Sequence, residues 1–227
     1  MSGRSRLAVI FVVALVVGAL FASGAAAART YCAKSYSYAG LVGSRKAHGI
    51  SAKLTVVKSP DVNTGHVAGW VGLGGVGMGP NGTTEWIQVG YSGFGDGQST
   101  LYFEVARPNG YPTYHVVREV KPGEAHRVGV SEMRNRRNFW RVWVDGRAVS
   151  KPIYLPASHG AWQPVATAES WNADSNRCNS YAYRFTRVKF ATRPNRHWRL
   201  MTDAYKLQDT GYRVRRGAEG FLARGAI

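Results

Sequence analysis

The sequence predicts an all-β protein made of antiparallel strands, arranged as a sandwich or a barrel. Short runs of alternating apolar and polar residues follow one another along most of the chain, and Gly, Pro, Asn and Asp separate them. No segment carries a convincing amphipathic helix pattern. Of the 227 residues, 44% are hydrophobic and 12% aromatic, so the chain can bury a sizeable core, which excludes a disordered protein.

The individual strands follow from the alternation and from the turns between them. We expect strands at residues 53–57, 66–73, 85–91, 101–106, 113–119, 126–133, 139–144, 165–171 and 181–190. Asp145-Gly146 is typical of a two-residue hairpin turn, because both residues tolerate a positive φ. Pro122-Gly123 combines a fixed φ with a permissive Gly, which predicts another turn. Many short strands at this spacing favour a sandwich or a barrel.

Residues 1–28 have the features of a secretory signal peptide. Arginines precede an apolar run, and small residues follow it up to Ala28. This order predicts cleavage after Ala28 and a secreted, extracellular protein. The apolar run is short for a membrane span, and a retained N-terminal anchor is the alternative. Outside the cell, Cys32 and Cys178 would meet an oxidising environment and could form a disulfide.

The remaining chain divides into a sheet domain at 29–193 and a C-terminal extension at 194–227. After Pro194 the alternation weakens, and the sequence becomes basic and irregular. We therefore expect an irregular extension that either packs on the sheet domain or trails from it.

Alternation also predicts which side chains share a face of a sheet. In the strand at 85–91, Ile87 and Val89 face the core and Gln88 lies opposite. The same rule gives an outer face with these residues: Trp70, Trp86, Gln88, Tyr102, Glu104, Glu169 and Trp171. Such aromatic residues, mixed with a few polar groups, indicate a groove that binds an extended peptide or polysaccharide. The alternative is that the extension or loops cover these Trp as ordinary core.

Three segments resemble the glutamic peptidases of the eqolisin type, in the order that this family has them. They are 70–75 (WVGLGG), 86–90 (WIQVG) and 168–171 (AESW), and the segment 101–104 (LYFE) matches the family's aromatic strand with its Glu. The resemblance extends over roughly residues 65–190. It implies a concanavalin- or jelly-roll-like β-sandwich of two antiparallel sheets, with the family's catalytic Gln and Glu on the concave face.

The resemblance implies that Glu169 is the general base and acid of peptide hydrolysis and that Gln88 is the orienting donor. A carboxylate can take a proton from water and return it to the leaving amine, and an amide can donate to the oxyanion. A glutamic carboxyl ordinarily titrates near ~4.3, so we expect an acid preference. Two positions depart from the family: Gly74 replaces a common Asp, and Ser92 replaces an acidic residue.

Two other functions fit the same predicted face. Glu104 and Glu169 together could serve a glycoside hydrolase, which needs two carboxylates across a sugar. A lectin-like module would bind carbohydrate or cell wall without catalysis. We expect no cofactor and no metal site, because the six His are scattered along the sequence without an H-E-x-x-H motif. Ser158-His159 lies in a Pro- and Gly-bounded loop, which is more typical of a turn than of a catalytic triad.

The strongly basic balance points first to an anionic partner. The formal charge is +17, from 30 Lys and Arg against 13 Asp and Glu. Two clusters contribute: Arg134, Arg136 and Arg137, and Arg213, Arg215 and Arg216. No nucleic-acid-binding motif accompanies them, and export argues against a nucleic-acid partner. We expect either adhesion to an anionic cell-wall surface or solubility alone, and a monomer.

Overall fold

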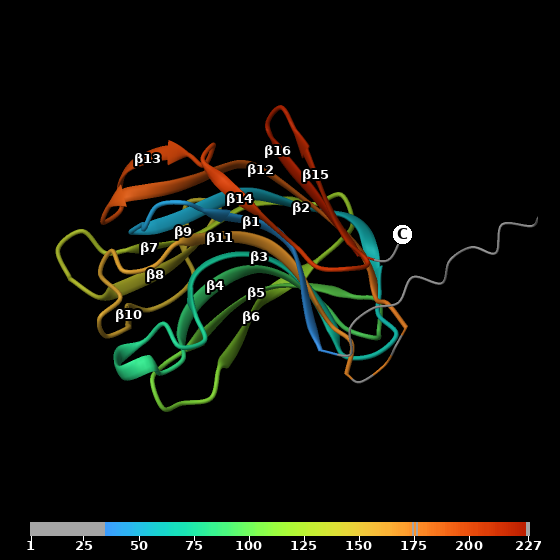
Figure 1. Cartoon of the computed structure of the whole chain (residues 1–227), viewed down its shortest axis with the longest axis horizontal. Helices are drawn as coiled ribbons and strands as arrows, with labels where there is room; N and C mark the ends of the chain where they lie inside the picture. Colours follow the sequence, from blue (N-terminus) through green and yellow to red (C-terminus); the bar gives the residue numbers. More distant parts are fainter. Residues whose placement is uncertain (1–34, 174, 176, 226–227) are drawn as a thin grey trace, which may run out of the picture.

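The computed structural model describes residues 35–173, 175 and 177–225, which form an antiparallel β-sandwich (Figure 1). Two sheets stack face to face, and the strands of the first sheet curve with their concave side away from the second. Apart from strands, the described residues contain a short 3-10 turn, η1 (Pro80–Gly82). None of their helical segments is long and apolar enough to cross a membrane. The predicted all-β sandwich is confirmed.

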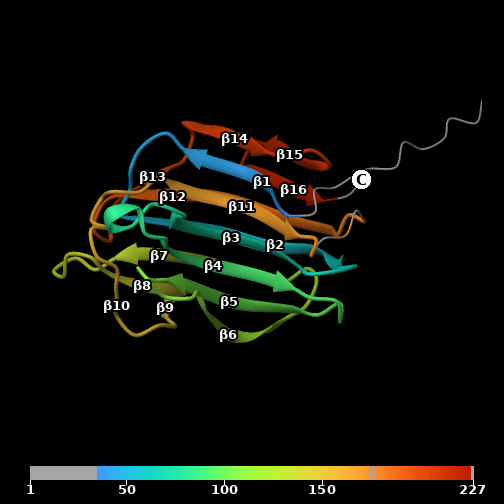
Figure 2. The ribbon, with the colours of Figure 1, turned by 60° about the horizontal axis from the view of Figure 1, so that its bottom comes forward.

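The first sheet holds the concave face, and its strands lie side by side in Figure 2. Within the described residues it has seven strands, in this order across the sheet: β14 (Ala204–Gln208), β1 (Tyr36–Gly43), β11 (Pro164–Trp171), β3 (His66–Gly75), β4 (Glu85–Gly93), β5 (Ser99–Ala106) and β6 (Thr113–Val120). The four central strands, β11 to β5, include the three segments that resemble the glutamic peptidases.

The second sheet packs behind the first and completes the sandwich. Its main path runs in this order: β10 (Ile153–Tyr154), β8 (Phe139–Val144), β7 (Ala125–Glu132), β2 (Gly49–Asp61), β12 (Ser180–Arg193), β16 (Gly220–Gly225) and β15 (Tyr212–Gly217). Two further strands join it at the side: β13 (Arg196–Leu200) pairs with β12, and β9 (Arg147–Ala148) pairs with β8.

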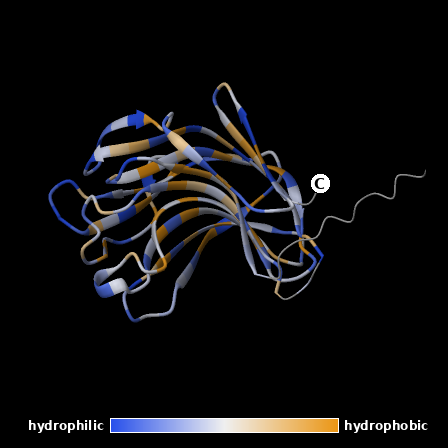
Figure 3. Ribbon diagram, viewed as in Figure 1, coloured by the Kyte–Doolittle hydropathy of each residue, from blue (hydrophilic) through white to orange (hydrophobic). Residues whose placement is uncertain are grey.

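The core lies between the two sheets, where the alternation predicts it. Val71 and Leu73 on β3 and Ile87 and Val89 on β4 are buried there, and Figure 3 shows apolar residues along the strands of both sheets. Burying each such side chain stabilises the fold by about 1.5–3 kcal/mol. Trp140 on β8 is fully buried and belongs to the same core, so its role is structural.

The C-terminal extension is not irregular, which corrects the prediction for 194–227. It forms β13 to β16 and packs on the sandwich: β14 pairs with β1 in the first sheet, and β15 and β16 form a hairpin in the second. Tyr212, Val214 and Phe221 are buried, while Arg213 is exposed beside them. The exposed arginines lower the apolar content of this segment, so its period of two was not recognised in the sequence.

Each predicted strand overlaps an observed one, although most bounds differ, and residues 139–144 form β8 with the predicted bounds. The hairpin turn is also confirmed, because Asp145 and Gly146 have φ values of 49° and 82°. The predicted signal peptide, residues 1–28, and Cys32 lie outside the described residues. Cleavage after Ala28 and the disulfide between Cys32 and Cys178 therefore stay predictions.

Candidate active site

The strand register brings the predicted site residues onto one face of the first sheet. Glu169 on β11 lies opposite Ala68 on β3, in the row next to the pair of Thr167 and Trp70. One row further on, Gln88 on β4 lies between Gly72 on one side and Glu104 on the other. Since positions two apart point to the same face of a strand, all these side chains project from the concave face.

Glycines on this face leave room for a ligand. Gly72 lies opposite Gln88, and Gly90 lies between Trp70 and Tyr102 in the neighbouring row. A Cβ at Gly72 would come within 2.8 Å of the Cβ of Gln88. Without side chains at these two positions, the larger residues around them form walls and the sheet itself forms a floor.

A cavity of about 700 Å³ opens between these walls. Its polar and aromatic lining consists of Tyr36, Tyr38, His66, Trp70, Trp86, Gln88, Ser92, Phe94, Tyr102, Glu104, Tyr114, Thr167 and Glu169. Among the described residues that line it, none is Lys or Arg. The cavity is thus an aromatic cleft with two carboxylates and one amide, of a size that suits a small ligand or a few residues of a polymer.

Glu169 is held by two nitrogen groups from β3. The indole Nε1–H of Trp70 donates to its Oε2 at 2.9 Å, and His66 Nε2 lies 3.5 Å from its Oε1. The side chain is almost buried, with 7% of the residue exposed. A donor on one oxygen and an imidazole near the other fix the carboxylate in place while leaving it open to the cleft.

Gln88 is held by two neighbours on β5. Its Nε2 donates to the carboxylate Oε2 of Glu104 at 2.9 Å and to the hydroxyl of Tyr102 at 3.1 Å. Both amide hydrogens are therefore engaged, and its Oε1 is the atom left to accept a hydrogen bond. Two hydrogen bonds to β5 thus orient the amide, as a positioned polar group in a cleft requires.

The charge of Glu169 acts on Glu104 within the cleft. Burial raises the pKa of the Glu104 carboxyl, and the negative charge of Glu169 raises it further. The hydrogen bond from Gln88 and the nearby His66 act in the opposite direction without cancelling this rise. The Glu104 carboxyl therefore holds a proton more readily in weak acid than an ordinary glutamic acid does.

The aromatic residues predicted for the outer face lie where the alternation places them. Trp70, Trp86 and Tyr102 line the cleft, Tyr102 being buried and both Trp half-buried. Trp171 lies next to the cleft, opposite His66, with 39% of the residue exposed. Its ring stacks on Tyr36, with 6.2 Å between the ring centroids. Trp70, Trp86 and Tyr102 are therefore walls of the cleft, whereas Trp171 lies outside its lining. The C-terminal strands bury none of the three Trp as core.

The two departures from the family pattern have local explanations. Gly74 has a φ of 89°, and a Cβ there would clash with the backbone of Glu85, so this backbone has no room for Asp. Ser92 joins a hydroxyl network instead of an acidic one. Its Oγ lies 2.8 Å from Thr100 Oγ1 and 2.6 Å from the hydroxyl of Tyr114.

Sequence reasoning missed several residues of the cleft. His66 opens β3, and because it shares the parity of Trp70, the alternation could have placed it on the outer face. Tyr36 and Tyr38 lie on β1, a strand that was not predicted, and Tyr38 is the register partner of Glu169. Phe94 follows β4 in a loop, where a period of two gives no signal.

Two solved structures of Scytalido-glutamic peptidase are similar to this chain. One contains a peptide-based transition-state analog and the other a transition-state analog inhibitor. Each has a TM-score of 0.58, at 16% and 15% identity respectively, and the match covers 85% of this chain and 98% of the peptidase. This chain has the glutamic-peptidase fold. The resemblance that the motifs indicate is therefore confirmed for the fold. No protein-family model matches the sequence, and no curated protein matches it.

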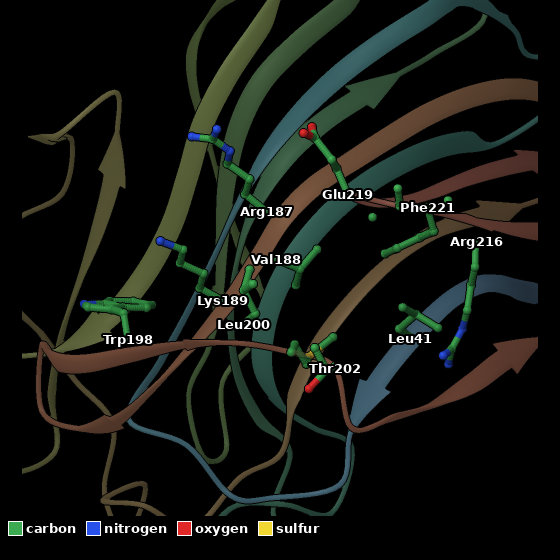
Figure 4. Close-up of a pocket in the computed structure, with 14 residues that line it drawn as sticks. Leu41, Arg187, Val188, Lys189, Trp198, Leu200, Thr202, Arg216, Glu219 and Phe221 are labelled. Carbon is green, nitrogen blue, oxygen red and sulfur yellow. The ribbon is translucent and has the colours of Figure 1, made fainter.

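A second cavity, of about 590 Å³, lies away from the glutamic-peptidase motifs (Figure 4). It is lined mainly by β12, β13 and the β15–β16 hairpin, and its charged residues include Arg187, Lys189, Arg216 and Glu219. Figure 4 shows that these charged ends do not converge on one point. This cavity therefore lacks the convergent acid and amide of the cleft and is the weaker candidate for catalysis.

Two of the six histidines lie close together in the structure, although they are far apart in the sequence. The scatter of the histidines along the sequence is therefore no reason to exclude a metal site, which corrects that prediction. His48 and His159 lie with their ring centroids 4.8 Å apart, and both contact Glu132. Ser158 is structural, because it accepts a hydrogen bond from Trp140 and donates one to the carbonyl of Leu155. For Ser158, these hydrogen bonds support the prediction that it does not belong to a catalytic triad.

Proposed function

We propose that this protein is a glutamic-type endopeptidase that hydrolyses peptides in the aromatic cleft with a water molecule activated by Glu169 and oriented by Gln88. The single observation that carries this proposal is that both residues line one cleft on a glutamic-peptidase fold, each positioned by its own hydrogen bonds. A cleft that is open at the surface and walled by aromatic rings suits an extended peptide chain.

In the proposed reaction, Glu169 takes a proton from water as the water oxygen attacks the carbonyl carbon of the scissile bond. The carbonyl becomes a tetrahedral oxyanion, and its collapse breaks the C–N bond. Glu169 then returns the proton to the leaving amine. Trp70 keeps the carboxylate aimed at the water through its 2.9 Å hydrogen bond. General acid–base transfer of this kind accounts for about 10²–10⁴ in rate.

Gln88 has to change one partner to stabilise the oxyanion. Both of its amide hydrogens are already donated, and the bond to the Tyr102 hydroxyl at 3.1 Å is the longer of the two. The oxyanion would replace this hydroxyl as acceptor, while Glu104 keeps the other hydrogen. A preoriented donor gives its greatest benefit to the oxyanion, because that is where negative charge develops.

An acid preference follows from the second carboxyl of the cleft. The raised pKa of Glu104 means that weak acid neutralises it readily. With Glu104 neutral, the developing oxyanion is no longer repelled by a second negative charge close to Gln88. We therefore expect peptide hydrolysis to fall as pH rises above the range in which Glu104 is protonated.

The proposal also includes secretion of the protein and its attachment to the cell wall. The N-terminal pattern supports a secreted protein that is cleaved after Ala28. The basic surface of the second sheet would hold the enzyme to an anionic cell-wall surface. The absence of Lys and Arg from the described cleft lining supports a separation between attachment and substrate binding.

A glycoside hydrolase is the second candidate. The observation that favours it is the raised pKa of Glu104, because a glycosidase needs one protonated carboxyl opposite an ionised one. In that mechanism Glu104 would be the acid and Glu169 the base or nucleophile. Polysaccharide binding without hydrolysis would instead make the protein a lectin-like module.

A digest of a peptide library between pH 2 and pH 7 tests the proposal. We expect cleavage that is strongest in acid, that is lost in Glu169→Gln and that is reduced at least tenfold in Gln88→Ala. A parallel assay on soluble polysaccharides separates the second candidate. Cleavage of polysaccharide but not peptide, with dependence on Glu104, would replace the peptidase proposal by a glycosidase. Absence of cleavage at every pH would refute both.

A further inference from the structure

Three side chains far from one another in the sequence meet outside the cleft. His48 directly precedes β2, Glu132 ends β7, and His159 lies in the loop between β10 and β11. The carboxylate of Glu132 is fully buried between the two rings. Its Oε2 lies 2.7 Å from His48 Nδ1, and its Oε1 lies 2.8 Å from His159 Nδ1. One ligand atom from each of the three residues lies within 4.8 Å of the others.

The backbone around these side chains is shaped to hold them. Asn138 has a φ of 64°; its N–H donates to Glu132 Oε1 at 2.7 Å, and its Oδ1 accepts from the N–H of His159 at 2.9 Å. The N–H of Glu132 donates to the carbonyl of His48 at 2.8 Å. At Gly160, with a φ of 58°, a Cβ would press on the His48 ring at 2.9 Å. The arrangement is therefore built into the fold.

We propose that His48, Glu132 and His159 form a binding site for a divalent transition-metal ion, with Zn²⁺ as the best match. Two imidazole nitrogens and one carboxylate oxygen are a ligand set that zinc uses, with water at the fourth position. Imidazole ligands disfavour Ca²⁺ and Mg²⁺, which prefer oxygen. This inference is independent of the proposed peptidase activity and uses none of the cleft residues.

Charge and access both suit a cation at this position. With neutral imidazoles, the cluster carries the single negative charge of Glu132, which attracts a divalent ion strongly in a buried setting. The side chains of His48 and His159 are 16% and 34% exposed, so an ion can enter from the solvent. Asn138 would act behind the ligands, since its two hydrogen bonds orient Glu132 and the His159 loop.

The spacing requires only a small adjustment. Zinc binds nitrogen and oxygen at about 2.0–2.2 Å, so ligand atoms in a tetrahedral site lie roughly 3.3–3.5 Å apart. The widest separation here is 4.8 Å, which a shift of the more exposed His159 on its loop can close. The ion would take the place of the two Nδ1 protons that now bridge the rings and the carboxylate, and each neutral ring would carry its single proton on Nε2 instead.

The test uses the untagged full chain, freed of metal with a chelator and titrated with Zn²⁺ at neutral pH against a chromophoric zinc indicator. We expect one equivalent of Zn²⁺ to bind with a micromolar or lower Kd, and the Tm to rise on saturation. His48→Ala and His159→Ala should each weaken binding at least tenfold and abolish the rise in Tm. His115→Ala, an exposed histidine that stacks on Phe103, should change neither.

The choice of variants separates a loss of zinc binding from a loss of folding. Glu132→Gln changes a fully buried group and can disturb folding, so the decision rests on His159→Ala, which alters a partly exposed loop residue. Absence of saturable Zn²⁺ binding to the unaltered chain would overturn the proposal. Equal affinity in His159→Ala and the unaltered chain, or equal losses in His115→Ala, would overturn it as well, because binding would then occur elsewhere.

Discussion

The outward faces of the two sheets differ in chemistry although they share one core. The concave face of the first sheet carries an aromatic cleft with Gln88, Glu104 and Glu169, and no Lys or Arg among its described lining residues. The outward face of the second sheet is basic: Lys53 pairs with Arg127 in register, and Arg213 pairs with Arg224, all of them exposed. Among the described residues, the Lys and Arg side chains therefore lie outside the lining of the cleft.

The difference between the two faces means that the partner of the basic surface and the substrate of the cleft need not be the same molecule. A strongly basic chain suggests an anionic partner, but that partner would meet the second sheet and not the cleft. The cleft has instead the groups that acid–base chemistry on an uncharged backbone needs: a fixed carboxylate, an oriented amide and aromatic walls. Substitutions on one face should therefore leave the property of the other face unchanged.

The largest expected effect comes from Glu169. Glu169→Gln keeps the shape of the side chain but removes the base, so kcat/KM on a fluorogenic peptide in acid should fall by about 10²–10⁴. The matched control is Glu219→Gln, the same change at an exposed position in the second cavity, which should leave kcat/KM unchanged. A comparable loss in both variants would break the distinction between the two faces.

Glu85 should give the next largest effect, on stability. Burial raises its pKa to about 7, and neither carboxylate oxygen has a hydrogen-bond partner within the described part of the chain. A carboxyl whose pKa is raised in the folded state stabilises the protein in acid and loses this contribution as pH rises towards 7. The free energy of unfolding should therefore drop by about 3 kcal/mol between pH 4.5 and pH 8 through this group.

Urea unfolding of Glu85→Gln at the two pH values checks this expectation. The variant should show a smaller drop than the unaltered chain, because an amide does not titrate. Glu219→Gln should keep the full drop. An unchanged pH dependence in Glu85→Gln would show that this carboxyl does not cause it.

Trp70 should have a smaller effect, on catalysis alone. Trp70→Phe removes the N–H that donates to Glu169, and a hydrogen bond to a charged group contributes about 1.5–3 kcal/mol, so we expect kcat to fall by about 10-fold or more with a smaller change in KM. Trp143→Phe removes a similar indole bond, to Ser131 in the second sheet. That variant should keep full kcat, and an equal loss there would make the role of Trp70 merely structural.

The smallest effect on hydrolysis should come from the basic face. A double variant, Arg213→Gln with Arg215→Gln, should keep kcat/KM within about twofold, since surface charges far from a site act weakly through screened electrostatics. The same variant should elute from an anionic phosphocellulose resin at lower salt than the unaltered chain. Unchanged elution would remove the proposed role of these arginines in attachment.

Much of the cleft was predictable because apolar and polar residues alternate clearly along its strands. The alternation around Ile87 and Val89 put Gln88 on the outer face, and the same rule placed Trp70 and Glu169 there. The rule failed where one face is rich in arginine, as beside Tyr212 and Val214. There the apolar residues are too few in the segment for the pattern to stand out.

Contacts between distant segments were not predictable from local patterns. His48 and Glu132 are 84 residues apart, and each looks like an ordinary polar residue at the end of a strand. Only the pairing of β2 with β7, in which Gly49 lies opposite Ser131, brings them together. The hydrogen bonds of Gln88 to Glu104 and of Trp70 to Glu169 likewise depend on register, which the sequence does not reveal by itself.

The most direct test of the central claim is a crystal structure of this protein with a peptide-based transition-state analog in acid. We expect the analog in the aromatic cleft, with one tetrahedral oxygen roughly 2.6–3.2 Å from the Glu169 carboxylate and another within the same range of the Gln88 amide. An analog that binds in the second cavity, or in the cleft without contact to Glu169 and Gln88, would contradict the account.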